Sequence, residues 1–251
     1  MLFITPKYLP KKLGLIGPIV VSVFWFSSAS AYDFAPTELD FSLSPEYCKA
    51  RFSVKGIRDL SGPWVRYSEA GINKWASIIG PDWRHLHHYC TGKVLLTRLQ
   101  TQQSTAFQGK ELGGKYWRAA EEMEYALKRS SVGSPLYNTM SIDYARAIEG
   151  MGKPDDAVKI LVKLRESSPK DVAVYIALAQ TLKRAGKTKD AIAVLEKAPV
   201  GSRSKGAIDF WLAHFYSDVG NLEKARHYAE LAENAGIKTD RLKKKLGAQE
   251  K

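Results

Sequence analysis

Residues 138–171 read NTMSIDYARAIEGMGKPDDAVKILVKLRESSPKD, and a pattern of the same length returns over 172–205 and 206–239 without a gap. When the three copies are aligned, the fifteenth position is always glycine, and the eighth and twentieth are always alanine. The seventh and eleventh positions are always large and apolar. A fixed period of this length is the signature of stacked helical hairpins. The residues at these positions are Gly152, Gly186 and Gly220; Ala145, Ala179 and Ala213; Ala157, Ala191 and Ala225; and Tyr144, Ile148, Leu178, Leu182, Leu212 and Tyr216.

Each copy is expected to form two antiparallel helices joined by a tight turn. The alanines let the two helices approach closely, and the glycine can take the left-handed conformation that ends the first helix. In the first copy Pro154 falls at the start of the second helix, and Asp155 and Asp156 follow at its positive end. One hairpin cannot cover its own apolar face, so neighbouring hairpins should stack.

This pattern resembles the tetratricopeptide repeat (TPR), which carries small residues at positions eight and twenty and a turn glycine near position fifteen. The resemblance implies an all-α fold, a TPR-like α-solenoid of antiparallel helix hairpins, with repeats at 138–171, 172–205 and 206–239. Residues 240–251 would form the C-terminal cap and tail. The segment from Thr239 to Leu246 is amphipathic and predicts a capping helix with Leu242 and Leu246 facing inward.

Residues 1–31 predict a secretory signal peptide. A basic start precedes an apolar run of fourteen residues, which is short for a membrane span of ~20 residues. We therefore expect cleavage after Ala31, no stable membrane insertion after signal removal, and a periplasmic or secreted protein; an uncleaved anchor is the alternative. The basic residues, the apolar run and the cleavage site are Lys7, Lys11 and Lys12, Leu13 to Phe26, and Ala29-Ser30-Ala31.

The formal net charge is +12, which falls to +9 when the three leader lysines are removed. Outside the cytoplasm a basic surface favours acidic proteins, anionic polymers or lipid headgroups as partners, and not nucleic acid. The alternative is a lysine coat that only keeps the protein solvated.

Residues 32–82 predict a helical and loop module in front of the repeats. We expect an extended lead-in over 32–43, then a helix with Ser44 as its N-cap that ends near Phe52. A loop should follow over 56–68, and a short helix near 69–79.

Residues 83–137 predict a degenerate TPR-like hairpin, because terminal repeats are expected to be atypical. Its first helix would run from Trp83 to about Gln102, and its second over 116–130. A glycine-rich loop over 108–115 would join the two helices.

The chain has two cysteines, Cys48 and Cys90. A lone pair in an exported protein usually forms a disulfide, which would contribute on the order of 4 kcal/mol by closing this loop. Free or redox-active thiols are the alternative, although the two-residue spacing of redox motifs is absent.

The segment from His85 to Cys90, HLHHYC, is the one place that indicates metal chemistry. On a helix His85 and His88 could share a metal, but a stable site needs three or four ligands and no acid in sequence reach completes it. No cofactor is therefore predicted, and His87 is expected to be a hydrogen-bonded core histidine. A metal- or haem-handling envelope protein that uses this segment is an alternative function.

The chain contains no Gly-rich phosphate loop, no G-x-S-x-G and no His-Glu-x-x-His, so we expect no enzymatic activity. Aromatic residues are frequent before the repeats, where they form either a small core or a platform that stacks on sugars or peptides. A glycan-binding envelope component is therefore another alternative. These aromatic residues are Tyr47, Phe52, Trp64, Tyr67, Trp75 and Trp83.

The TPR resemblance implies that positions 2, 5, 9, 12 and 13 of each first helix line a concave groove. There a basic stripe would run beside apolar side chains, which suits an extended peptide with an acidic group and an apolar anchor. The alternative is that these charges only solvate the groove. The expected contact residues are Ile142, Arg146, Ile176, Gln180, Lys183, Arg184, Phe210 and His214.

We therefore expect a non-catalytic scaffold or adaptor of the bacterial cell envelope that binds another envelope protein or peptide. On this view, replacing Lys183 and Arg184 together by glutamate should abolish partner capture and leave the melting temperature unchanged.

Overall fold

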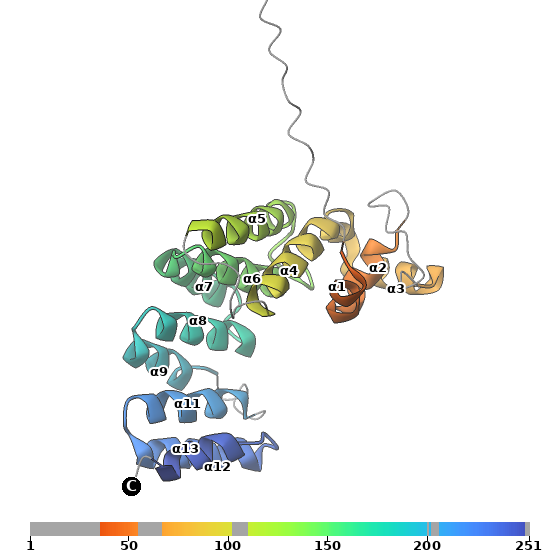
Figure 1. Cartoon of the computed structure of the whole chain (residues 1–251). Coiled ribbons are helices and arrows are strands. Elements are labelled where there is room, and N and C mark those ends of the chain that lie inside the picture. The colour runs from red at the N-terminus through yellow and green to blue at the C-terminus, as the bar shows by residue number, and fades with distance from the viewer. Residues whose placement is uncertain (1–35, 55–66, 102–109, 200, 202–205, 249–251) are drawn as a thin grey trace, which may run out of the picture. The chain divides into compact units, whose positions relative to one another are not determined.

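The computed structural model describes residues 36–54, 67–101, 110–199, 201 and 206–248, and every regular element in these residues is helical (Figure 1). The all-α prediction is confirmed. The predicted signal peptide and most of the predicted loop over 56–68 lie outside the described residues. No described helix combines the length and the apolar character needed to cross a bilayer.

The helices before the repeats differ from the prediction in three places. Residues 38–43 were expected to be extended but form a helix, because Thr37 and Asp40 make a capping box. The next helix has Pro45 and not Ser44 as its N-cap; the Ser44 hydroxyl instead donates to the Asp40 carbonyl at 2.7 Å. The helix expected to begin at Trp83 is preceded by a 3₁₀ turn. These elements are α1 (Glu38–Leu43), α2 (Glu46–Phe52), α3 (Glu69–Ile79), which is as predicted, η1 (Gly80–Arg84) and α4 (Leu86–Thr101).

Helices α4 and α5 (Lys110–Leu127) pack together as the predicted hairpin, and α5 also packs against the first repeat. Residues 110–115 were expected to be loop but are helical, so Gly113 and Gly114 lie inside α5. The apolar face of α5 buries Ala119, Ala120 and Met123, and this burial outweighs the low helix propensity of glycine.

Gly92 sets the distance between α4 and α5. A Cβ at this position would lie 2.7 Å from the Ala119 carbonyl oxygen and 2.8 Å from Met123 Cγ. We expect Gly92→Ala to lower the free energy of unfolding by about 1–2 kcal/mol, since overpacking exceeds the gain in helix propensity. Urea denaturation followed by circular dichroism measures this change.

Gly113 in α5 provides the matched control. A Cβ there would meet no heavy atom of the described residues within 4 Å. Gly113→Ala should therefore stabilise the protein by up to about 1 kcal/mol. Equal shifts in the two variants would show that Gly92 is not a packing constraint.

The three repeats form three hairpins with the same turn. Gly152, Gly186 and Gly220 all have φ = 78°. In each turn the glycine N–H donates to the carbonyl three residues back, and the next residue donates to the carbonyl five residues back, as in a Schellman motif. The hairpins are α6 (Tyr137–Gly150) with α7 (Pro154–Ser167), α8 (Val172–Arg184) with α9 (Thr188–Glu196), and α11 (Ala207–Asp218) with α12 (Leu222–Asn234).

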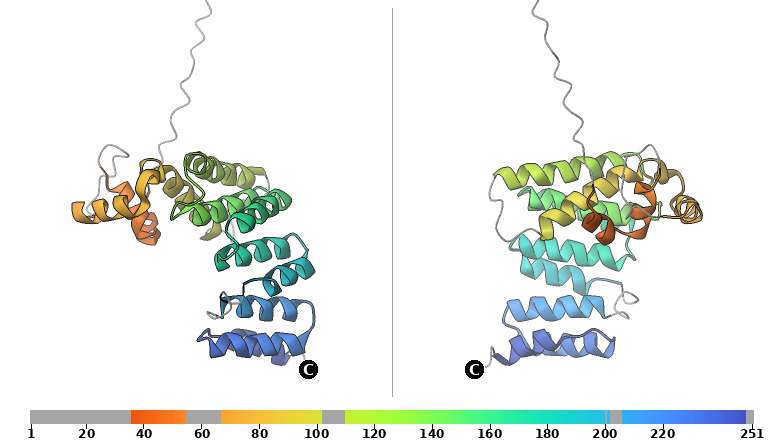
Figure 2. Two further views of the ribbon diagram at one scale, coloured as in Figure 1. Left: turned by 180° about the vertical axis from the view of Figure 1, so that it is seen from behind. Right: turned by 45° about the vertical axis from the view of Figure 1, so that its right-hand side comes forward.

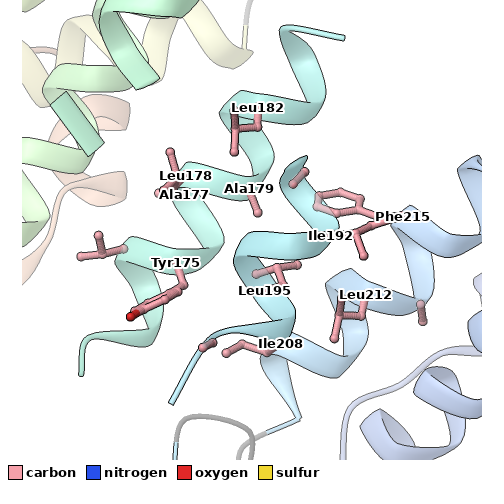
Figure 3. Close-up of a cluster of buried hydrophobic side chains, with 14 of the residues drawn as sticks. Tyr175, Ala177, Leu178, Ala179, Leu182, Ile192, Leu195, Ile208, Leu212 and Phe215 are labelled. Atoms are coloured by element: carbon pink, nitrogen blue, oxygen red, sulfur yellow. The ribbon is translucent and has the colours of Figure 1, made fainter. Parts of the chain in front are cut away.

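Consecutive hairpins stack on one another, α7 against α8 and α9 against α11, and both views of Figure 2 show them in chain order. The six alanines at positions eight and twenty are 0% exposed, as the close approach of the helices requires. Figure 3 shows part of the repeat core on α8, α9 and α11, which includes Leu178, Leu195 and Leu212. The predicted capping helix is confirmed: α13 (Asp240–Ala248) packs on α12 and buries Leu242 and Leu246.

Candidate functional site

The expected contact residues lie on the first helices of the three repeats, α6, α8 and α11. Ile142 is 6% exposed and belongs to the repeat core, so little of its side chain is accessible to a ligand. Ile176, Gln180, Phe210 and His214 are half-buried and therefore retain some accessible surface.

The expected basic stripe is not a row of unpaired cations. The Arg184 guanidinium binds both carboxylate oxygens of Glu149, with Nη2 to Oε2 at 2.7 Å, and Lys183 forms an ion pair with Asp218. Arg146 donates from Nη1 to Asp143 at 2.9 Å. Each of these cations is paired with a carboxylate of the protein. Neither the interpretation as a peptide-binding stripe nor the alternative of solvating charges predicted these pairs.

Two of these ion pairs join consecutive repeats at equivalent positions. Each joins position 12 of one repeat to position 13 of the next: Glu149 to Arg184, then Lys183 to Asp218. Asp218 also accepts from Lys245 of the capping helix at 2.8 Å. Burial alone would raise the pKa of Asp218, but the bonds from the two lysines outweigh it and lower the pKa. The pairs thus connect consecutive repeats along the array.

These two inter-repeat ion pairs change the result expected for the double substitution of Lys183 and Arg184 by glutamate. Glutamate at positions 183 and 184 would face Asp218 and Glu149, so both inter-repeat pairs would become repulsive. We therefore expect the melting temperature of this double variant to fall. That variant does not separate partner binding from repeat stacking.

A cleft of about 360 Å³ opens where the α4–α5 hairpin meets the first two repeats. The Tyr116 ring lies directly on Gly150, where a Cβ would come within 2.3 Å of a ring carbon. Glycine at this position therefore lets α5 approach α6. The cleft is lined by Gln100, Tyr116, Arg146, Glu149, Gly150 and Arg184.

Arg146 is held in the cleft by a buried carboxylate beneath it. Asp143 is 1% exposed and accepts from the Tyr89 hydroxyl at 2.9 Å, from Lys93 Nζ at 2.8 Å and from Arg146. Burial raises the pKa of Tyr89, and the charge of Asp143 raises it further, so the hydroxyl keeps its proton and donates it. Asp143 thereby ties α4 to α6 and orients one wall of the cleft.

A cluster of aromatic rings lies on α11. The Phe210 ring centroid lies 4.6 Å from that of His214 and 5.5 Å from that of Trp211, and all three side chains are half-buried. Burial lowers the pKa of His214, and Lys245 and Lys183 lower it further against the opposing charge of Asp218. A neutral, partly exposed aromatic surface of this kind can pack against an apolar side chain.

The histidine segment is arranged differently from the prediction. His85 lies before α4, and the fold brings an acid to His88: its Nδ1 lies 2.7 Å from Glu122 Oε2. Even so, no three His, Cys, Asp or Glu side chains of the described residues are grouped so that they could hold a metal ion. His87 is hydrogen-bonded as predicted, with its Nδ1 3.4 Å from Arg51 Nη2, but it is half-buried and does not lie in the core.

Cys48 and Cys90 are both 0% exposed, and their sulfurs lie at bonding distance with the Cα atoms 5.5 Å apart. The pair joins α2 to α4 in the geometry of a disulfide. A bonded Cys90 sulfur would not be a thiolate ligand for a metal.

Residues 149–200, from the end of α6 into the loop after α9, match the family described as Tetratricopeptide repeat. The chain therefore contains tetratricopeptide repeats. The match covers the whole of α7 and most of the second repeat, and the flanking hairpins have the same turn geometry.

Solved structures with some similarity to this TPR protein include two MamA chains and one protein from Thermus thermophilus. The MamA RS-1 ArsTM double mutant has 15% identity and a TM-score of 0.44, over 66% of this chain and 82% of that chain. The thermophilic TPR protein TTC0263 has 14% identity and a TM-score of 0.40, over 66% and 92%. MamA AMB-1 has 18% identity and a TM-score of 0.39, over 76% and 96%. No curated protein sequence matched the chain.

Proposed function

We propose that this TPR protein is a non-catalytic adaptor of the bacterial cell envelope. It holds a peptide segment of another envelope protein in the cleft between the α4–α5 hairpin and the first two repeats. The observation that carries this proposal is the cleft itself, whose volume of about 360 Å³ falls in the range of ligand sites. Helical repeat arrays of this kind serve as interaction scaffolds, and their surfaces are extended binding faces.

The charges in the cleft favour a partner segment with an acidic side chain. Two guanidinium groups, Arg146 and Arg184, face the cleft with one carboxylate, Glu149. Arg146 shares the Asp143 carboxylate beneath it with Lys93, so these three cations and two carboxylates leave one net positive charge. A guanidinium has five N–H donors, and each arginine uses only part of its set within the protein. The remaining donors can bind a carboxylate with charge-assisted hydrogen bonds. The aromatic cluster on α11 supplies the apolar contact along the same series of helices.

The envelope location is supported by the leader-like segment over residues 1–31 and by the buried cysteine pair. Paired cysteines persist in oxidising compartments and are rare in the cytosol.

The test places a photo-crosslinking amino acid at position 100, which lines the cleft and is exposed. Irradiation of the native cell, followed by mass spectrometry, should yield a product with an envelope protein. The same amino acid at Lys189, which is exposed on α9 and does not line the cleft, should yield no such product.

A pair of charge variants tests the role of the acidic group. Gln100→Glu should weaken capture by about fivefold, and Gln100→Lys should not, because only the added carboxylate repels an acidic ligand. Identical products from positions 100 and 189, or equal weakening by both charge variants, would contradict binding of an acidic segment in the cleft.

A further inference from the structure

A second cleft, of about 450 Å³, lies between α2 and α3, away from the repeats. Three of its residues, Gly71, Lys74 and Trp75, lie on one side of α3, because Lys74 and Trp75 are three and four positions after Gly71, and the N-cap Ser68 lies three positions before it. Glu46 from the start of α2 and Tyr67 complete the lining. None of these residues takes part in the cleft proposed for the partner protein.

The two aromatic rings of this cleft are held in place. The Tyr67 ring lies on Gly71, where a Cβ would come within 2.6 Å of it, so glycine provides the space for the ring. Trp75 Nε1 donates to the Tyr67 hydroxyl at 2.8 Å. Both rings are half-buried and are therefore accessible from the cleft. Rings fixed in this way bind a ligand with little loss of side-chain entropy.

The charged groups of the cleft indicate the sign of the ligand. Glu46 is already compensated, because Lys49 Nζ lies 2.8 Å from its carboxylate. Lys74 is exposed and makes no hydrogen bond or ion pair with another described residue. The uncompensated charge of these lining residues is thus positive and favours an anionic group in the ligand. Two aromatic rings and a carboxylate alone would suit a quaternary ammonium group, but the positive charge of Lys74 opposes such a ligand.

We infer that the α2–α3 cleft binds an acidic saccharide. The apolar C–H face of one pyranose ring would pack on Trp75 and Tyr67, and a uronate carboxylate would bind Lys74. Aromatic surface combined with a few polar groups is the usual composition of a ligand cleft. Among the aromatic residues that indicated a stacking platform, Trp64 lies outside the described residues, Phe52 is buried in the core, and Tyr67 and Trp75 line this cleft.

The experiment is calorimetric titration of the mature protein with an oligo-uronate and with a neutral oligosaccharide of equal length. The oligo-uronate should bind, and Lys74→Ala should weaken this binding by about tenfold, the effect of one lost charge-assisted hydrogen bond. The affinity for the neutral oligosaccharide should not change in this variant.

Variants of two tryptophans separate stacking from folding. Trp75→Ala should abolish saccharide binding, whereas Trp75→Phe keeps a ring and should restore part of it. The control is Trp117→Ala, because Trp117 is 52% exposed on α5 and outside this cleft. Its binding should equal that of the unaltered protein.

Three results would overturn the inference. The first is the absence of heat with either oligosaccharide at millimolar concentration. The second is equal weakening of uronate and neutral binding by Lys74→Ala. The third is Trp75-dependent binding of phosphocholine in the absence of saccharide binding. Each leaves the adaptor proposal intact, since crosslinking from position 100 tests a different cleft.

Discussion

Asp143→Ala is expected to lower the free energy of unfolding by about 2–3 kcal/mol, the cost of leaving a buried hydroxyl without its charged acceptor. The carboxylate is 1% exposed and accepts from Tyr89, Lys93 and Arg146. Without it, the fully buried Tyr89 hydroxyl loses its carboxylate acceptor, and two cations lose their shared counter-charge. Because the bonds join α4 to α6, the α4–α5 hairpin should loosen from the repeats. Guanidinium denaturation and hydrogen exchange of α4 measure both effects.

The matched control is Asp156→Ala. Asp156 also pairs with a lysine, Lys159 Nζ at 3.0 Å, but their side chains are 55% and 74% exposed. Removing this surface pair should cost less than about 0.5 kcal/mol. If the two substitutions cost the same, Asp143 does not carry the contact between the hairpin and the repeats.

Replacing Cys48 and Cys90 together by alanine should lower the free energy of unfolding by about 4 kcal/mol. The two residues are 42 positions apart, and a crosslink over a loop of this length restricts the unfolded chain by about that amount. The loss should be concentrated in α2, which the bond attaches to α4, and in α3, which packs on α2. Thermal denaturation of the double variant, and of the unaltered protein with and without reductant, measures it.

The Cys48–Cys90 pair also tests the proposed location in the cell envelope. Protein recovered from the periplasm should show no free thiol when denatured without reductant. A chain produced in the cytoplasm without residues 1–31 should show two free thiols and unfold like the double variant. Two free thiols in the periplasmic protein, or a double variant as stable as the unaltered protein, would contradict a structural disulfide.

Much of the fold is predictable because its strongest signals are local. Gly152, Gly186 and Gly220 mark turns that need a positive φ, and any chain with glycine at that spacing can form them. Errors occurred where a weaker local signal was missed, as with the Thr37–Asp40 capping box, or where packing outweighed propensity, as at Gly113 in α5.

The candidate site was less predictable. Arg184 and Lys183 were correctly placed on a first helix, but their partners Glu149 and Asp218 belong to neighbouring repeats. The sequence shows these acids at position 12 of the first repeat and position 13 of the third. Whether they pair with a cation of the neighbouring repeat depends on how one hairpin is offset against the next. Tyr67 and Trp75 were noted as aromatic residues, but only the packing of Tyr67 on Gly71 brings them to one cleft.

By itself, the sequence determined that this protein is a stack of helix pairs with a capped end. Turn conformation and close helix approach depend on single residues repeated at a fixed period, such as the glycines at position fifteen and the alanines at positions eight and twenty. Only the tertiary structure decided which charges are neutralised and which clefts are open. An ion pair such as Arg184 with Glu149, or a bond such as Tyr89 to Asp143, joins residues 35 and 54 positions apart. The free energy of such contacts depends on distance and burial in the folded protein, and neither is encoded in the local pattern.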